Sequence, residues 1–321
     1  MQFKSILKEE INSYLQVQTS TGQNVKNVEY VLLSLDRFIH QANISEKILS
    51  EKMITSWCKI LTCKASTKRN KISVIKNFAE YLNSLGNNAF IPEIPRTSTD
   101  YVPYVFSEVE WLRIIDVCDN LTYGHSYSSA PPIEFPLLVR MLYGCGLRLN
   151  EALSLQIKDI DLDKGTLTIR HAKRNRQRIV PMSKSLTEIC RRYCLRMCLI
   201  ISEDNFMFPN YYKKPYSKRW AQQWFEIILK QAMIPYERTR RHERGPCLHC
   251  LRHTFTFRSF AKAEAEGHSL DDSVPFLSTY LGHENIFGTD KYLKFSYELY
   301  PDAHKKISNY TADVFPEVTV E

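Results

Sequence analysis

A proline-rich stretch near residue 100 most constrains how this chain can fold. Pro92, Pro95 and Pro103 fall where the sequence has no helical period, and proline lacks the backbone N–H that a helix interior needs. Because a chain of 321 residues favours two domains, we interpret this stretch as an interdomain linker. The expected division is residues 1–95, a linker over 96–104, and residues 105–321.

Apolar residues before the linker follow the period of amphipathic helices. One set is Val28, Val31, Leu32, Leu35, Phe38 and Ile39, and another is Ile72, Ile75, Phe78, Ala79 and Leu82. The start of the helix that contains the second set is basic and carries Lys64, Lys68, Arg69, Lys71 and Lys76. Such a helix can lie along DNA phosphates, although a charged face that contacts only solvent is the competing interpretation.

The second half begins with a helix-start signal and continues with helices and short strands. Ser107 and Glu110 have capping-box spacing, and Phe106 with Trp111 fits a hydrophobic staple. Further helices are expected over 134–143, from Arg148 onward, and over 184–201, 248–263 and 270–281. Strands are expected over 160–162, 166–169 and 178–181, with a turn at 163–165. The predicted fold class is mainly α with a small antiparallel β-sheet.

Composition narrows the partner and the cell compartment. The formal net charge is +8, which favours a polyanionic partner without identifying it. No apolar run approaches the ~18 residues of a membrane span, and the N-terminus lacks the apolar core of a signal peptide. We therefore expect a cytoplasmic protein that does not span a membrane.

Nine cysteines allow two interpretations. Cys190, Cys194 and Cys198 recur every four residues on an expected helix, and Cys247 with Cys250 forms C-x-x-C. One interpretation is a zinc site built from these two groups. Reduced thiols in a cytosolic protein are the simpler account, so we expect no metal and no other cofactor.

The chemistry-bearing residues gather between positions 249 and 292. His249 and Arg252 are three residues apart on an expected helix, and His283 and Tyr292 follow. Arginine holds phosphate oxygens with a planar fork of donors, histidine transfers protons near neutral pH, and tyrosine can act as a covalent nucleophile. Together these residue types suit phosphoryl transfer to a tyrosine hydroxyl.

Three features upstream complete this group. Arg148 follows the Gly144-Cys145-Gly146 break, and Glu151 lies one turn later, where it can orient the arginine. Lys173 begins a basic hairpin that also contains Arg174 and Arg176. The order of arginine box, hairpin lysine, His-x-x-Arg, Leu-Gly-His and tyrosine resembles the tyrosine recombinase (phage integrase) family. The resemblance is clear over residues 134–300 and general over 1–95.

The resemblance implies a fold and a set of roles. A helical, SAM-like core-binding domain would occupy 1–95, and a DNA breaking-rejoining catalytic domain would occupy 105–321. The implied catalytic residues are Arg148, Lys173, His249, Arg252, His283 and Tyr292, with Glu151 in support. Arg174 and Arg176 compete with Lys173 for its role, and Tyr297 and Tyr300 compete with Tyr292.

Basic residues elsewhere are candidate DNA contacts. Tyrosines and a tryptophan interleave with the cluster at 213–219, and a second cluster lies at 238–244. Both are expected in loops that contact the DNA backbone, with a solvated face as the alternative. The full set of predicted contacts is Lys64, Lys68, Arg69, Lys71, Lys76, Arg174, Arg176, Arg178, Lys213, Lys214, Arg240 and Arg241.

The function implied by the resemblance is site-specific recombination of double-stranded DNA through a 3′-phosphotyrosyl intermediate. Integration, excision or resolution of a mobile element would be the biological event. The first helix begins almost at once, so we expect the two-domain, Xer-like type without an arm-binding domain. The expected assembly is a homo-tetramer on two DNA sites, held by exchange of the C-terminal segment, with accessory recombination proteins as further candidate partners. The alternatives are a type IB topoisomerase and a DNA-binding protein without catalysis.

Overall fold

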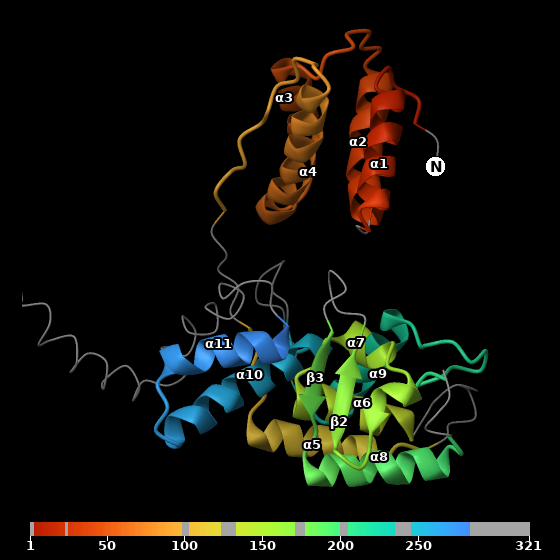
Figure 1. The fold of residues 1–321 in the computed structure, drawn as a ribbon, viewed down its shortest axis with the longest axis vertical. Coiled ribbons are helices and arrows are strands. Elements are labelled where there is room, and N and C mark those ends of the chain that lie inside the picture. The colour runs from red at the N-terminus through yellow and green to blue at the C-terminus, as the bar shows by residue number, and fades with distance from the viewer. Residues whose placement is uncertain are drawn as a thin grey trace, which may run out of the picture. The chain divides into compact units, whose positions relative to one another are not determined.

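The computed structural model describes residues 3–22, 25–97, 103–122, 133–170, 177–199, 205–234 and 245–282. Two compact units divide the chain, Met1–Asp100 and Tyr101–Glu321. The first unit is drawn in red to orange in Figure 1, and the second in yellow to blue. Each unit has its own hydrophobic core.

The first unit is helical throughout its described elements. Its helices are α1 (Lys8–Ser20), α2 (Lys26–Gln41), α3 (Glu51–Ile60) and α4 (Ala65–Ser84). Trp57 and Phe78 are fully buried at its centre. The buried Asp36 accepts hydrogen bonds from the backbone N–H groups of Lys4 and Ser5, which fixes the chain entry against α2. The expected apolar stripes of α2 and α4 therefore form this core.

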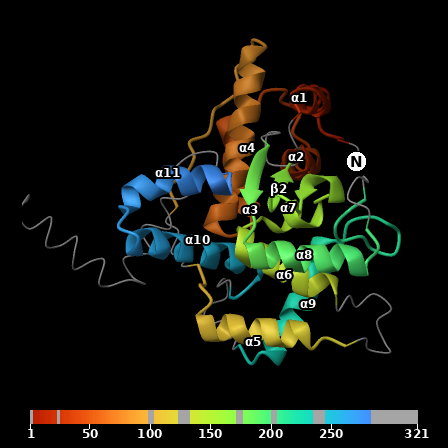
Figure 2. The same cartoon turned by 60° about the horizontal axis from the view of Figure 1, so that its bottom comes forward.

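The second unit is built around a helix that is buried on nearly all sides. Its helices are α5 (Glu108–Asp119), α6 (Glu134–Cys145), α7 (Leu149–Leu153), α8 (Lys184–Arg196), α9 (Lys218–Gln231), α10 (Leu248–Ala265) and α11 (Leu270–Leu281), with a short 3-10 helix at Ile157–Asp159. Phe135, Leu138 and Leu142 of α6 are at most 1% exposed. Helices α5, α7, α8 and α10 all pack against α6, and α11 lies along α10 (Figures 1 and 2).

A small antiparallel sheet lies beside these helices. Its strands are β1 (Ile160–Asp161), β2 (Thr166–Ile169) and β3 (Arg178–Pro181), in the order β1-β2-β3. Leu167 faces Val180 across the β2–β3 pair, and both are completely buried. The prediction of a mainly α fold with a small antiparallel sheet is confirmed.

Most predicted elements are present, and the differences have local causes. The capping box at Ser107 and Glu110 is formed, and the helices expected over 248–263 and 270–281 are α10 and α11. The helix expected over 184–201 is shorter, because Cys198 adopts a positive φ of 52° just after α8 ends. The sequence reading missed α9, whose first residues were taken for a basic loop. Ser217 starts this helix by accepting the Trp220 N–H.

Candidate active site

Arg148 lies at the sharp turn between α6 and α7. Gly146 ends α6 with φ +59°, and a Cβ there would come within 2.4 Å of the Phe255 ring. Only glycine permits this turn together with the close packing of α10. Arg148 then serves as the N-terminal boundary residue of α7, and its guanidinium donates to Glu151 and to the Gly282 carbonyl, each at 2.8 Å. The predicted contact between Arg148 and Glu151 is confirmed.

Glu151 is a buried carboxylate held by two arginines. Its side chain is 3% exposed, and Arg178 donates to both of its oxygens at 2.9 and 2.7 Å. The Arg148 backbone N–H donates to it as well, at 2.9 Å. Burial alone would raise the pKa of this carboxyl, but the hydrogen bonds and charges of Arg178 and Arg148 outweigh burial and lower the pKa to about 2. Glu151 is therefore ionised at neutral pH and fixes both guanidinium groups.

Arg252 is the most enclosed of the candidate catalytic side chains that the structure describes. It lies on α10, is 1% exposed, and donates to the carbonyls of Gly146 at 2.6 Å and Leu281 at 2.7 Å. A buried guanidinium is costly unless hydrogen bonds satisfy it. These bonds join the end of α6 to the end of α11.

The C-terminal end of α11 is the point where the arginines meet. Leu281 accepts from Arg252, and the next residue, Gly282, accepts from Arg148. Gly282 has φ +64°, and a Cβ there would lie 3.0 Å from Arg178 Nη1, so glycine also allows Arg178 to approach. Arg148, Arg178 and Arg252 thus approach Leu281 and Gly282, the two residues that directly precede His283.

His249 occupies the exposed side of the first turn of α10. The ring of His253, which is 8% exposed, packs edge-on against it with ring centroids 4.6 Å apart. His249 and Arg252 share a helix as expected, but the histidine faces outward while the arginine is enclosed. An exposed imidazole can exchange a proton with a ligand or with solvent.

Several predicted site residues lie outside the described residues. These are Lys173, Arg174, Arg176, Arg240, Arg241, His283 and Tyr292. Their roles stay predictions. The structure thus brings together Arg148, Glu151 and Arg252 of the predicted catalytic set, and it places His249 on the same helix as Arg252.

Arg178 was expected among the DNA contacts but has another partner. Its side chain is 11% exposed and binds the Glu151 carboxylate, so little of it is left for a phosphate. The alternation of residues in the expected strand could have predicted that Arg178 faces the protein interior. Arg178 is two residues before the buried Val180, and alternate residues of a strand point to the same face.

The basic residues of α4 have mixed surroundings. Lys64 precedes the helix and Arg69 is exposed in its second turn. Lys68 is half-buried, Lys71 lies 6.0 Å from the centre of the Tyr30 ring, and Lys76 pairs with Glu80 at 3.8 Å. The N-terminal end of α4 is therefore the more accessible part of this predicted contact surface.

Lys213 and Lys214 lie at the tip of an ordered turn. The Asn210 side chain accepts the backbone N–H groups of Tyr212 and Lys214 at 2.9 and 3.1 Å. Tyr211 and Tyr212 are 92% and 77% exposed at this tip. The turn therefore exposes two cations and two aromatic rings at the surface.

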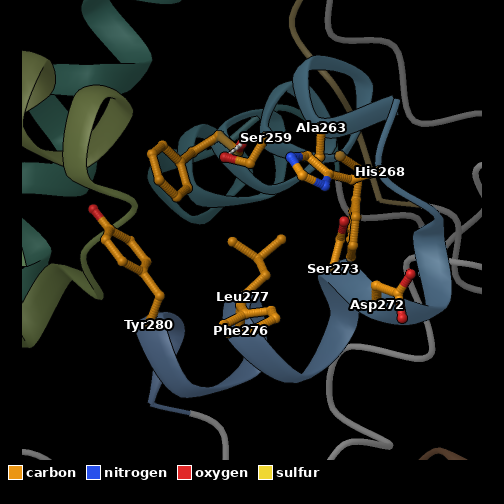
Figure 3. Close-up of a pocket in the computed structure, with 10 residues that line it drawn as sticks. Ser259, Ala263, His268, Asp272, Ser273, Phe276, Leu277 and Tyr280 are labelled. Atoms are coloured by element: carbon orange, nitrogen blue, oxygen red, sulfur yellow. Dashed lines mark hydrogen bonds between the residues drawn. The ribbon is translucent and has the colours of Figure 1, made fainter. Parts of the chain in front are cut away.

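A hollow lies between α10 and α11, with a volume of about 530 Å³. In Figure 3, Leu277 of α11 points toward the part of α10 that carries Ser259. Phe276 also lines it and is 78% exposed. The lining is mainly apolar, which suits an apolar segment better than a phosphate.

The described residues contain neither a candidate metal cluster nor a membrane-spanning helix. No group of three or more histidine, cysteine or acidic side chains is placed there to hold a metal ion. In the same part of the chain, no helix is long and apolar enough to cross a membrane.

Comparison with known proteins identifies the family. Residues 105–298 match the model of the phage integrase family. A putative integrase/recombinase, y4rB of Sinorhizobium fredii, is 24% identical over 309 residues, which cover 94% of this chain and 97% of the relative. The tyrosine recombinase XerD of Rickettsia bellii is 26% identical, over 81% of this chain and 84% of the relative.

Solved structures share the fold. A XerH site-specific recombinase bound to palindromic difH substrate superposes with a TM-score of 0.64 and 18% identity, over 85% of this chain and 77% of that one. The Tn1549 transposon integrase with transposon right end DNA gives a TM-score of 0.62 and 17% identity, over 88% and 94%. The family match over residues 105–298, which covers most of the second unit, shows that the chain belongs to the phage integrase family of tyrosine recombinases.

Proposed function

We propose that this chain is a site-specific DNA recombinase that cuts and rejoins duplex DNA through a covalent tyrosine intermediate. The observation that carries the proposal is the convergence of Arg148 and Arg252 on consecutive carbonyls at the end of α11. Two guanidinium groups held at one place are suited to the negative charge that a phosphate develops in the transition state.

The proposed reaction starts with attack of the Tyr292 hydroxyl on a scissile phosphate. The tyrosine–phosphorus bond forms as the bond to the 5′-oxygen breaks, which leaves a 3′-phosphotyrosyl link and a free 5′-hydroxyl. Free tyrosine has a pKa of about 10, so a base must accept its proton, and the exposed His249 is our candidate. Lys173 protonates the leaving oxygen, and Arg148, Arg252 and His283 donate to the nonbridging oxygens.

A phosphate can bind Arg252 only after a conformational change, because the side chain is enclosed. Arg148 is 32% exposed, whereas Arg252 is 1% exposed. A phosphate reaches Arg252 only when the end of α11 moves and at least one of its carbonyl bonds opens. We therefore propose that DNA binding displaces the Leu281–Gly282 backbone and exposes Arg252.

The proposed partner is double-stranded DNA. The XerH and Tn1549 integrase structures are complexes with a DNA substrate and with transposon DNA, which supports this choice. In this chain, the N-terminal end of α4 and the Lys213–Lys214 tip are the described basic surfaces that would contact its backbone. We assign the first unit, which carries α4, as the core-binding domain, and integration, excision or resolution of a DNA element as the biological event.

The proposed assembly is a tetramer on two DNA sites, held by exchange of the C-terminal segment around residues 302–311. The hollow between α10 and α11 supports this idea, because it is apolar and carries the exposed Phe276. We propose that this hollow accepts the segment of a neighbouring protomer.

The deciding experiment uses a nicked trapping substrate, on which a covalent protein–DNA adduct accumulates. Tyr292→Phe removes one hydroxyl, so it should keep DNA binding and abolish the adduct. Tyr297→Phe is the matched control and should form the adduct normally. Adduct from the Tyr292→Phe protein, together with none from Tyr297→Phe, would show that Tyr297 is the nucleophile. No adduct from the wild-type protein on any duplex bearing its element ends would refute the proposed function.

A further inference from the structure

Two cysteines flank the predicted catalytic histidine at the start of α10. Cys247 is the residue at the N-terminal boundary of this helix, and Cys250 lies in its first turn. Their sulfur atoms are 3.5 Å apart, and the Cys250 backbone N–H donates to the Cys247 carbonyl at 2.8 Å. The side chains therefore face each other as two thiols, with His249 between them in the chain.

The distance is close to what a disulfide requires. An S–S bond is about 2.05 Å long, so the sulfurs must approach by roughly 1.5 Å. Cys250 is completely buried in the core of the second unit, whereas Cys247 is half-buried and has an extended backbone outside the helix. Cys247 is consequently the residue that would move.

The two thiols differ in a way that gives them separate roles. The hydrogen bond with Cys247 and then burial raise the pKa of the Cys250 thiol well above its usual value, so Cys250 is a poor first nucleophile. Cys247 lies at a helix N-terminus, where the helix dipole favours a negative charge, and it is the more accessible of the two.

We propose that Cys247 and Cys250 form a thiol–disulfide exchange site that controls the position of His249. The oxidant is a small-molecule disulfide such as glutathione disulfide. The Cys247 thiolate attacks one of its sulfurs and releases one glutathione thiolate, which leaves a mixed disulfide on Cys247. Cys250, after losing its proton to solvent, attacks the Cys247 sulfur and releases the second glutathione. The protein loses two hydrogen atoms, and the oxidant is reduced to two thiols.

Closure of the disulfide alters the turn that carries His249. Cys247 is bonded through Leu248 to His249, so its movement toward the core shifts the first turn of α10. The consequence for DNA cleavage rests on the proposed function, whereas formation of the disulfide does not. A displacement of about 1 Å in a reacting group can slow catalysis up to about 100-fold, so we expect adduct formation to fall by about tenfold to 100-fold.

The chemical test follows the mass of the full chain after treatment with glutathione disulfide. Cys63→Ser and Cys198→Ser first remove two exposed thiols. In this background, the protein should lose two hydrogens within the peptide that contains Cys247 and Cys250. Cys250→Ser should instead retain one glutathione on Cys247, and Cys247→Ser should stay unmodified at this peptide. Serine is a favoured residue at a helix N-terminus, so Cys247→Ser should fold.

Other cysteines of the same chain serve as internal controls. Burial raises the pKa of the Cys145 thiol to about 12 and is the main cause of a similar value for Cys190, so both should stay unmodified in the same peptide map. Absence of the Cys247–Cys250 disulfide, or glutathione retained on Cys250 in the Cys247→Ser protein, would overturn the proposal.

The functional test measures adduct on the nicked substrate before and after oxidation. The oxidised protein should be slower, dithiothreitol should restore its rate, and Cys247→Ser should have the same rate in both states. An oxidised protein with a confirmed disulfide and an unchanged rate would refute control of His249. If even the reduced protein forms no adduct, the proposed recombinase function fails, and the masses still decide whether the exchange site exists.

Discussion

Glu151→Gln is the substitution whose effect can be calculated most directly from the structure. The carboxylate accepts four N–H bonds between 2.7 and 2.9 Å, from Arg148 and Arg178, and its side chain is 3% exposed. Glutamine keeps the shape but removes the charge, and it leaves two guanidinium groups around a neutral amide. Removing one partner of a buried ion pair in this way costs about 3–5 kcal/mol.

The pKa gives a second scale for the same interaction. A value of about 2 in place of the usual 4.5 corresponds to about 3 kcal/mol of stability. Because the pKa is lower in the folded protein, this contribution is complete above pH 4.5 and is lost as the pH falls toward 2. The difference between wild type and Glu151→Gln should therefore be about 3 kcal/mol at pH 7 and roughly 1.5 kcal/mol at pH 3.

The assay is urea unfolding followed by tryptophan fluorescence. A Trp57→Phe background leaves Trp111, Trp220 and Trp224, which all belong to the second unit, so the signal reports that unit. Glu188→Gln is the matched control, since Glu188 pairs with two arginines at the surface, and it should leave the unfolding midpoint unchanged. A loss below about 1 kcal/mol for Glu151→Gln at pH 7, or an equal loss at pH 7 and pH 3, would refute the reasoning.

Arg178→Met tests the pair from its other side. If Arg178 acts through Glu151, the Glu151→Gln/Arg178→Met double variant should lose less free energy of unfolding than the two single variants lose in sum. The difference should be at least about 1 kcal/mol. Additive losses would mean that Arg178 stabilises the fold independently of Glu151.

Four further predictions concern the turn at α6, the proposed acid, the assembly and DNA binding. Gly146→Ala should destabilise the second unit by about 2 kcal/mol or more, because the added Cβ would clash with the Phe255 ring. Gly267 also has a positive φ, but no atom lies within 4 Å of the position of its Cβ. Gly267→Ala should therefore lose less stability in the same urea unfolding assay. Lys173→Ala should be inactive on normal DNA and largely rescued when sulfur replaces the bridging 5′-oxygen, because a thiolate leaves without a proton from a general acid. Arg148→Ala should stay impaired on both substrates. Absence of rescue would mean that Lys173 binds DNA but does not act as the acid. Phe276→Asp should spare binding to a single half-site and lower cooperativity in gel-shift titrations, and normal synaptic complexes would exclude the α10–α11 hollow as the docking site. DNA affinity should fall steeply with salt, and a log–log slope near zero would count against a phosphate-binding surface.

The sequence alone determined much of the architecture because its signals are local. Helical spacing, the capping box at Ser107 and the strand–turn–strand pattern over 160–169 each act within a few residues, and all three appear in the structure. The contact between Arg148 and Glu151 was predictable for the same reason, since residues three apart in a helix are neighbours. The missed helix α9 shows the limit, because its basic start obscured an apolar stripe that includes Ala221, Phe225 and Leu229.

Only the tertiary structure decided which groups share one place. Arg178 and Glu151 are 27 residues apart, and Arg148 and Gly282 are 134 apart, so no local pattern links them. The enclosure of Arg252 depends on the ends of α6 and α11 both meeting α10. Charge and hydrogen-bonding capacity can be read from a residue type, but its burial and its partners follow from how distant segments pack. For that reason the sequence identified Arg178 as a cation, and packing made it the buried partner of Glu151.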